Sequence, residues 1–575
     1  MQRNFSAQGG CAYGAKIILA CLAVGFFLVY SFLTLVVYLP NAQTGMIFDW
    51  PDEMANYFFI KNFAQTSSFT AAEPLNALIS NPYIHPRSVN IVDNAIVPMS
   101  FLGMLIVYGA LAKIISVYGA LFLTPLFAVL TVVFLSLIMK RLFGEAVGIF
   151  SAILCFIVPG FWYYASQPML PNVLFIFCVV SGLYLLVKLF GWDGHYEKSQ
   201  LPIANDQSIS NVPMTKQEWL LAMGAGLCLG FAAITRAIEV FWVALVLLIL
   251  LCAYWQDVKK KWPRLVVFCV AGLLPILLML FLNHQIYGKI FTVGYLRQDQ
   301  PTFLGGLPTE FKVDNNGILN WLKLVVAPFG LHVKEFFWVV WQYIIKINWP
   351  FFILAIAAIG RLLAIKKTKI EKIFLGLALA PLGLALFYGN WIFVDKMVLK
   401  YNYLSSSYVR YFLLIYIFCA LLTAWLVGRL RQTKLDKVAR AIIVAAVFVS
   451  LFFYSCYNVF FNTSDGLLAQ QQKIIKYHEQ RALVENKIPA NAILLVDRAD
   501  KIFWPEHKVV IFQGDFSIFP EMKKLLNIAP IYYYGEGVES LMDKINEKLK
   551  AVGVSFQSGA QIVDDFHLYK LTTRP

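Results

Sequence analysis

Phe48-Asp49-Trp50-Pro51-Asp52-Glu53-Met54-Ala55-Asn56-Tyr57 follows the first long apolar segment of the chain. The 575-residue chain around it is 59% hydrophobic and only 14% charged, with a mean hydropathy of +0.67. A soluble protein of this length does not bury so much apolar surface. The sequence therefore predicts a polytopic α-helical membrane protein in which Asp52 and Glu53 stand where the chain leaves the bilayer, a costly position that favours a functional role.

The distribution of charge and cysteine excludes several classes of protein. The chain has 48 Lys and Arg against 33 Asp and Glu, a net charge of +15, but the basic residues gather in short loops between apolar segments. This pattern is the positive-inside bias of membrane proteins and argues against nucleic-acid binding. None of the nine cysteines lies in the polar C-terminal region or forms a CxxC pair, so neither a disulfide framework nor a zinc site is expected.

Apolar segments of about 20 residues, the length that spans a bilayer, predict about eleven crossings. They are residues 14–39, 117–139, 146–165, 169–190, 218–235, 237–255, 265–283, 335–359, 373–393, 409–428 and 439–461. With the N-terminus in the cytoplasm, the basic loops near residues 140, 260, 366 and 434 all face inward. Most of the unusual polar residues outside the soluble region then gather on the outer side.

Residues 95–116 are apolar enough to cross, but a crossing there would turn every later basic loop outward. We therefore expect an interfacial or half-inserted helix over 95–116. The alternative, that another segment also fails to cross, stays open. The first outer loop would then run over residues 40–116.

Residues 465–575 are polar, and apolar runs rich in β-branched and aromatic residues alternate there with helical patterns. Strands are expected near 492–496, 508–512, 531–534 and 567–571, and helices near 466–486, 521–527 and 538–550. These elements predict a small α/β domain outside the membrane, beside a membrane domain over residues 1–464. No glycine-rich nucleotide fingerprint opens its helices, so no nucleotide cofactor is expected.

Asp52 and Glu53 suit two interpretations. Proline followed by acids is an ordinary helix start, because acids stabilise the positive end of the helix dipole. Alternatively, Asp52 is a general base that takes a proton from an acceptor hydroxyl or amine. Glu53 would then orient Asp52, or both would bind a divalent cation such as Mg²⁺ or Mn²⁺.

Cationic residues on the outer side offer a site for an anionic headgroup. His85 and Arg87 lie in a rigid proline-flanked stretch, and arginine binds phosphate through paired hydrogen bonds. Arg236 and Arg410 stand at outer ends of apolar segments, against the positive-inside bias, although an arginine there also snorkels. Together with a nearby carboxylate they predict a site for an anionic lipid headgroup beside an acid–base residue.

In their order along the chain, these residues resemble a family. The chain is similar to the GT-C fold glycosyltransferases that include protein O-mannosyltransferases and the aminoarabinose transferase of lipid A. The resemblance covers roughly residues 14–461, with a soluble domain appended. The motifs that carry it are Pro51-Asp52-Glu53 with Tyr57, His85-Pro86-Arg87, Ser166-Gln167-Pro168-Met169-Leu170-Pro171-Asn172, Thr235-Arg236, Asn283 through Gly294-Tyr295, and Arg410-Tyr411.

The resemblance implies a sugar donor linked to polyprenyl phosphate, inversion at the anomeric carbon, Asp52 as the catalytic acid–base residue, and cations near the donor phosphate. Tyr57, Gln167, Asn172, Asn283 and Tyr295 are expected to line the substrate site. Gln167 and Asn172 depart from the basic and acidic residues frequent in the family, which puts a metal requirement in doubt.

The predicted function is transfer of a sugar from a polyprenyl-phosphate donor to a protein, lipid or glycan acceptor. The enzyme would lie in a bacterial inner membrane, or in the endoplasmic reticulum, with its active site and C-terminal domain extracytoplasmic. The alternative is a transporter or flippase of a lipid-linked sugar or another anionic lipid. That alternative favours internal repeats with broken helices, and no internal repeat is evident in the sequence.

Overall fold

A computed structural model describes residues 4–39, 45–192, 214–292, 294, 330–391, 404–430, 433–462, 465–537, 539–557 and 559–573. The chain divides into two compact units. Unit 1 combines Met1–Leu33, Phe122–Leu278 and Leu304–Ala469, and unit 2 combines Thr34–Leu121, Met279–Phe303 and Gln470–Pro575. The segment that follows the first span therefore belongs with the C-terminal segment.

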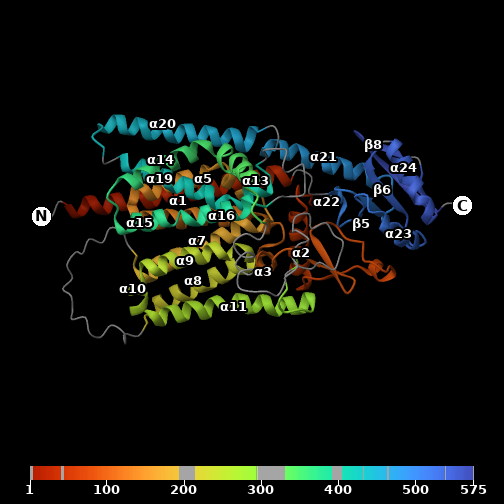
Figure 1. Cartoon of the computed structure of the whole chain (residues 1–575), viewed down its shortest axis with the longest axis horizontal. Helices are drawn as coiled ribbons and strands as arrows, with labels where there is room; N and C mark the ends of the chain where they lie inside the picture. Colours follow the sequence, from red (N-terminus) through yellow and green to blue (C-terminus); the bar gives the residue numbers. More distant parts are fainter. Residues whose placement is uncertain are drawn as a thin grey trace. The chain divides into compact units, whose positions relative to one another are not determined.

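Unit 1 is helical, and its long helices run alongside one another (Figure 1). Its helices are α1 (Asn4–Tyr38, which runs on into unit 2), α4 (Leu123–Phe143), α5 (Glu145–Ile157), α6 (Pro159–Ala165), α7 (Pro171–Phe190), α8 (Lys216–Thr235), α9 (Val240–Ala253), α10 (Trp255–Lys260), α11 (Trp262–Tyr287, which ends in unit 2), α13 (Val333–Val339), α14 (Trp349–Ala364), α15 (Lys369–Gly376), α16 (Leu379–Gly389), α18 (Ser407–Tyr411), α19 (Leu413–Arg429) and α20 (Lys437–Cys456).

The polytopic membrane character is confirmed. Within the described residues, seven helical stretches are long and apolar enough to cross a membrane, or up to nine if each of two bent pairs is one span. The two other expected spans fall on shorter apolar helices, Ala237–Ala253 and Leu413–Arg429. Each of the eleven expected segments thus coincides with apolar helix, but the structure does not establish eleven crossings.

Two expected single spans are each broken into a bent pair. The chain turns by 67° between α5 and α6, and by 99° between Val333–Lys346 and α14. The first break falls at Val158, whose backbone is extended, immediately before Pro159. Proline at a helix start lacks a backbone donor and disfavours helical conformation in the residue before it, which explains the break.

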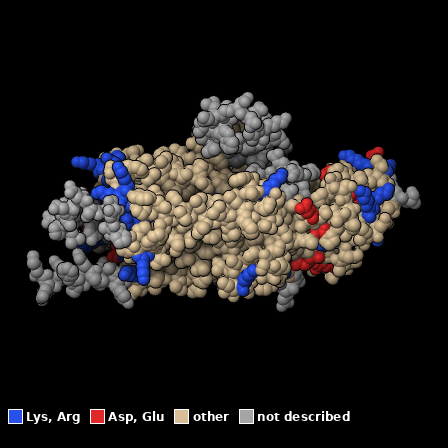
Figure 2. Space-filling model, turned by 90° about the horizontal axis from the view of Figure 1, so that it is seen from below, with Lys and Arg blue, Asp and Glu red and all other residues tan. Residues whose placement is uncertain are grey.

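Basic residues gather at one end of unit 1. Figure 2 shows this end beside a broad surface without charged side chains. The loops at this end are tied by ion pairs: Arg264 at the start of α11 contacts Glu218 of α8 at 2.6 Å, and Arg429 pairs with Glu371 of α15. The grouping is the charge asymmetry that the positive-inside bias predicts for the loops on one side of a membrane.

Unit 2 is built on a mixed sheet, and the α/β character expected for residues 465–575 is confirmed. Its strand order in the described part is β5-β4-β6-β9-β7, with β8 paired to β9. β4, β5 and β6 are parallel, and β9 is antiparallel to β6. The strands are β4 (Ile493–Val496), β5 (Lys508–Ile511), β6 (Ile531–Glu536), β7 (Val554–Phe556), β8 (Ala560–Val563) and β9 (Phe566–Thr573), and the helices are α21 (Leu467–Glu485, which begins in unit 1), α22 (Asp500–Phe503), α23 (Phe519–Leu525) and α24 (Glu539–Leu549).

Residues 45–116, the described part of the expected first outer loop, carry two helices and a small antiparallel sheet. The helices are α2 (Pro51–Thr66) and α3 (Leu102–Ile115), and the strands β1 (Ala71–Ala72), β3 (Ala95–Pro98) and β2 (Val89–Val92) pair in that order. The expectation of one helix over 95–116 is therefore wrong for residues 95–98, which pair with β2 instead. Helix α3 is 14 residues long and spans about 21 Å, less than the roughly 30 Å hydrocarbon core, so it does not cross as a straight helix.

The first outer loop is built into the core of the C-terminal segment. Ile79 and Ile84 are buried in the same apolar cluster as Val510 and Phe512. Ile84 also forms an antiparallel bridge with Val510 beside β5. The loop that carries Asp52 is consequently held by strand β5 rather than by its own short strands alone.

Candidate functional site

Asp52 and Glu53 lie in the first turn of α2, after Pro51. The two carboxylates differ sharply in surroundings: Glu53 is fully buried, whereas Asp52 is half-buried. Glu53 accepts a hydrogen bond from the Trp50 backbone at 3.2 Å and one from the Tyr38 hydroxyl at 3.4 Å. Glu53 thus caps its own helix, and this confirms the helix-start interpretation as structure.

Asp52 receives a hydrogen bond from the first outer loop. The Ser88 hydroxyl donates to Asp52 Oδ1 at 2.6 Å. Such a bond fixes the orientation of the carboxylate. The structure thus shows a half-buried, oriented carboxylate, and the role of Asp52 as a general base stays a prediction.

Arg87 and His85 are engaged inside unit 2. Arg87 Nε and Nη2 donate to Asp500 Oδ1 at 2.9 and 2.7 Å, and Nη2 also donates to the Arg498 carbonyl at 2.8 Å. Burial lowers the pKa of the His85 imidazole, although the Pro86 carbonyl and Asp500 act in the opposite direction. The neutral form of His85 is therefore favoured, and phosphate binding by either residue stays a prediction.

The charge of the segment before α2 is balanced by lysines of the C-terminal segment. Asp49 is buried and contacts Lys473 Nζ at 2.7 Å and Lys501 Nζ at 3.1 Å. Burial alone raises the pKa of Asp49, but the two ammonium groups outweigh it and lower this pKa to about 2. These ion pairs anchor the start of α2, and with it Asp52.

The ion pairs of Asp49 predict a contribution to the free energy of unfolding that is lost in acid. Because the folded pKa of Asp49 is about 2, below its ordinary value, the contribution is present above pH 4 and is lost as the pH falls from about 4 to 2. It amounts to about 2 kcal/mol by the shift of the pKa. Thermal unfolding of wild type and Asp49→Asn between pH 2 and 6 should show a difference in Tm at pH 6 that vanishes near pH 2. A constant difference would contradict the role of the charge.

Unit 1 contains a second polar cluster, around Arg236. Arg236 Nε contacts Glu239 Oε1 at 2.6 Å, and its Nη2 donates to the Tyr388 hydroxyl at 3.3 Å. Tyr388 stacks on Tyr411 with ring centroids 4.6 Å apart. The pairs place residues from the η5 turn (Ala237–Glu239), from α16 and from α18 in one cluster.

Two arginines lie against the Tyr411 ring. The Cζ atoms of Arg236 and Arg410 are 4.9 and 5.3 Å from its centroid. Glu239 is the carboxylate paired with Arg236, and Arg410 Nη2 donates to the Ser407 hydroxyl at 3.2 Å. Cations held over an aromatic ring in a partly buried place suit an anionic group such as a phosphate.

The predicted lining residues lie in both units. In unit 1, Gln167 is buried after α6, and Asn172 Nδ2 at the start of α7 donates to the Arg410 carbonyl at 2.9 Å. In unit 2, Tyr57 packs on Phe48 with centroids 5.2 Å apart, and Asn283 Nδ2 donates to the Thr292 carbonyl at 2.6 Å. Asn283 therefore closes the turn after α11. Tyr295 lies outside the described residues.

The described residues do not offer a ready metal centre. No group of three or more His, Cys, Asp or Glu in this part of the chain is placed to hold a metal ion. The Glu53 carboxylate, one of the two predicted ligands, is held by Trp50 and Tyr38. A metal at Asp52 and Glu53 therefore has no third described ligand of these types beside it, and a metal requirement stays a prediction.

Some residues that contact Asp52 or Arg236 are not identifiable from the sequence around them. Ser88 is 36 residues from Asp52, and Tyr388 is 152 residues from Arg236. Ser88 and Tyr388 are ordinary polar and aromatic residues in their own segments, so only the tertiary fold identifies them as partners.

Comparison with known proteins establishes the fold. No protein-family model matches the chain, and no curated protein matches it in sequence. The structure is similar to ArnT from Cupriavidus metallidurans bound to undecaprenyl phosphate, with 10% identity, a TM-score of 0.54 and coverage of 96% of this chain and 97% of that one. ArnT in the apo state gives 11% identity, a TM-score of 0.52 and coverage of 97% and 98%. The Archaeoglobus fulgidus oligosaccharyltransferase in the apo form gives 13% identity, a TM-score of 0.49 and coverage of 92% and 71%.

The match to ArnT runs along nearly the whole of both chains and includes the soluble segment. The chain therefore has the GT-C fold, as the order of its motifs predicts.

Proposed function

We propose that this protein is an integral-membrane glycosyltransferase that moves a sugar from a polyprenyl-phosphate donor to an acceptor. The observation that carries the proposal is the position of Asp52. It is a carboxylate oriented by Ser88 at the start of the first outer helix, in a fold shared with a transferase crystallised with undecaprenyl phosphate. In the proposed arrangement Asp52 lies at the membrane boundary, where a lipid-linked donor would be found.

In the proposed reaction the acceptor hydroxyl or amine attacks the anomeric carbon from the face opposite the phosphate. The bond to the phosphate oxygen breaks, and the released polyprenyl phosphate keeps the electron pair. Asp52 accepts the proton of the attacking group, which makes that group a stronger nucleophile as the new bond forms. Attack from the opposite face inverts the anomeric configuration.

The donor phosphate is proposed to bind the cations at Tyr411. Arg410 is half-buried, and the guanidinium groups of Arg236 and Arg410 both lie against the Tyr411 ring. These two guanidinium groups would stabilise the phosphate as its negative charge grows during bond cleavage. The active site would face the extracytoplasmic side of a bacterial inner membrane, because the basic end of unit 1 is expected to face the cytoplasm.

Arg410→Gln is expected to raise the KM for the donor by roughly 10- to 100-fold, because a charge-assisted contact with the phosphate is lost. Steady-state kinetics with a radiolabelled donor measures this effect. Arg361→Gln, at the basic end of unit 1, is the matched control and should leave KM unchanged. Unaltered donor kinetics in Arg410→Gln would remove this residue from the phosphate site.

Arg236 should behave differently from Arg410. Glu239 is buried beside Arg236, so Arg236→Gln leaves a buried carboxylate without its cation. Loss of thermal stability should accompany the loss of donor binding in this variant. Equal Tm values for Arg236→Gln and Arg410→Gln would contradict the pairing.

A further inference from the structure

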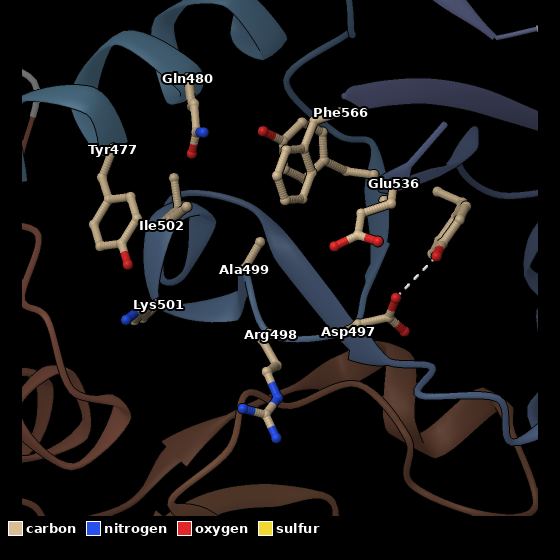
Figure 3. A pocket seen from close by; sticks show the side chains of 12 residues that line it. Tyr477, Gln480, Asp497, Arg498, Ala499, Lys501, Ile502, Glu536 and Phe566 are labelled. Carbon is tan, nitrogen blue, oxygen red and sulfur yellow. Dashed lines mark hydrogen bonds between the residues drawn. The ribbon is translucent and has the colours of Figure 1, made fainter. Parts of the chain in front are cut away.

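A cavity of about 410 Å³ opens in unit 2 at the carboxyl ends of strands β4 and β6 (Figure 3). Asp497 and Arg498 directly follow β4, and Glu536 ends β6. The chain places β5 on one side of β4 and β6 on the other, so the strand order reverses here. Crevices at the carboxyl ends of parallel strands beside such a reversal are the usual ligand sites of open α/β sheets.

A buried tyrosine hydroxyl in the cavity wall has no partner. Tyr534 is only 1% exposed, and its Oη makes no hydrogen bond within the described part of the chain. Its ring is fixed by stacking on Phe566 at 5.2 Å and by edge contact with Phe503 at 5.1 Å. Buried polar groups in proteins are nearly always paired, so an unpaired hydroxyl on a residue that lines the cavity favours a ligand there.

The side chains that point into the cavity combine aromatic rings with hydrogen-bonding groups. Figure 3 shows the Gln480 amide and the Glu536 carboxylate directed towards its centre, with Tyr477 and Phe566 on different sides. Of the two cations in the wall, Lys501 is paired with Asp49, and Figure 3 shows the Arg498 guanidinium directed away from the centre of the cavity. A carboxylate directed into the cavity, with neither cation directed towards it, disfavours an anionic ligand such as phosphate.

A neutral sugar matches this set of groups. Its hydroxyls donate to a carboxylate and accept from an amide or a tyrosine hydroxyl, and its C–H faces contact aromatic rings. The volume falls within the range of small-molecule sites, roughly 300–1,000 Å³. We propose that this cavity binds a neutral sugar unit and, resting on the function proposed above, that this sugar belongs to a glycan acceptor.

The Arg87–Ser88 segment connects the cavity to Asp52, and this connection is the reason for assigning the sugar to the acceptor. Arg87 donates to the carbonyl of Arg498 in the cavity wall, and the next residue, Ser88, donates to Asp52. One short segment thus contacts both the cavity wall and the proposed base. A glycan held in the cavity would be retained on the same unit as Asp52.

Direct binding to the full chain in nanodiscs tests the proposal. The Asp52→Asn protein would be titrated with methyl glycosides and di- and trisaccharides of glucose, galactose, mannose and N-acetylglucosamine, by saturation-transfer NMR and calorimetry. At least one neutral sugar should bind. Tyr534→Phe should weaken it about fivefold, and Glu536→Gln at least about tenfold.

Matched controls separate binding from folding. Tyr532→Phe removes a hydroxyl from the same strand outside the cavity wall, and Glu547→Gln removes an exposed carboxylate from α24; both should bind sugar normally. Tyr534→Phe should keep the wild-type Tm without ligand, because the lost hydroxyl has no described partner.

Three results would overturn the proposal: no sugar of the panel binds, binding is unchanged in Tyr534→Phe and Glu536→Gln, or a short peptide binds the cavity and no sugar does. A protein that binds sugar through these residues but does not cleave any polyprenyl-phosphate sugar would instead refute the proposed transfer. In that case the sugar site would stand.

Discussion

Asp52→Asn is expected to slow sugar transfer by roughly a thousandfold, within the range that a positioned general base contributes. Asparagine keeps the shape of the side chain but does not accept the proton of the attacking group. The Ser88 hydroxyl still has an oxygen to which it donates, so the local structure should persist. Product formation from a saturating donor, followed in nanodiscs with wild type and variant side by side, measures the loss.

Two further variants make this test specific. Asp93→Asn removes the same charge from an exposed turn of the same loop, where a positive φ of 48° suits asparagine, and should retain full activity. Ser88→Ala should slow sugar transfer by about tenfold, a smaller loss than that of Asp52→Asn, because it releases the carboxylate without removing it. Wild-type activity in Asp52→Asn would rule this residue out as the base.

Arg87→Ala is expected to lower the free energy of unfolding by about 3–5 kcal/mol, the cost of leaving a buried charge unpaired. The partner carboxylate of Asp500 is only 1% exposed, and it also accepts a hydrogen bond from the Arg87 backbone at 2.8 Å. Loss of this pair should loosen the first outer loop from the C-terminal segment within unit 2. Thermal unfolding and protease resistance of the loop give the readout.

A double-mutant cycle with Asp500→Ala separates structure from phosphate binding. If the pair is structural, the double variant should be far less unstable than the sum of the two single variants. The donor KM of the folded fraction should then be unchanged. A stable Arg87→Ala protein with a raised donor KM would instead support the phosphate role predicted from the sequence.

Regular elements of the chain were predictable because they carry strong periodic signals. The all-buried run of β4 and the tyrosine-rich β6 lie where the apolar runs predict them, and α21 follows the helical pattern of 466–486. Strands β1 to β3 were missed because they are only two to four residues long. Their pairing depends on packing rather than on local propensity.

The candidate site was predictable only in part. The sequence identifies Asp52 from its position after the first span, but its partners are set by contacts far apart in the chain. Arg87 lies 413 residues from Asp500, and no local pattern shows that a predicted phosphate ligand is already held by a carboxylate. Likewise, Tyr534 is an unremarkable strand residue until the fold leaves its hydroxyl buried and unpaired.

Release of free polyprenyl phosphate from a panel of radiolabelled polyprenyl-phosphate sugars, by the purified protein in nanodiscs, tests the central claim most directly. A transferase should release the lipid phosphate from one donor and place the label on an added acceptor. Movement of intact donor across the membrane of sealed vesicles, without any cleavage, would contradict the account and identify a transporter.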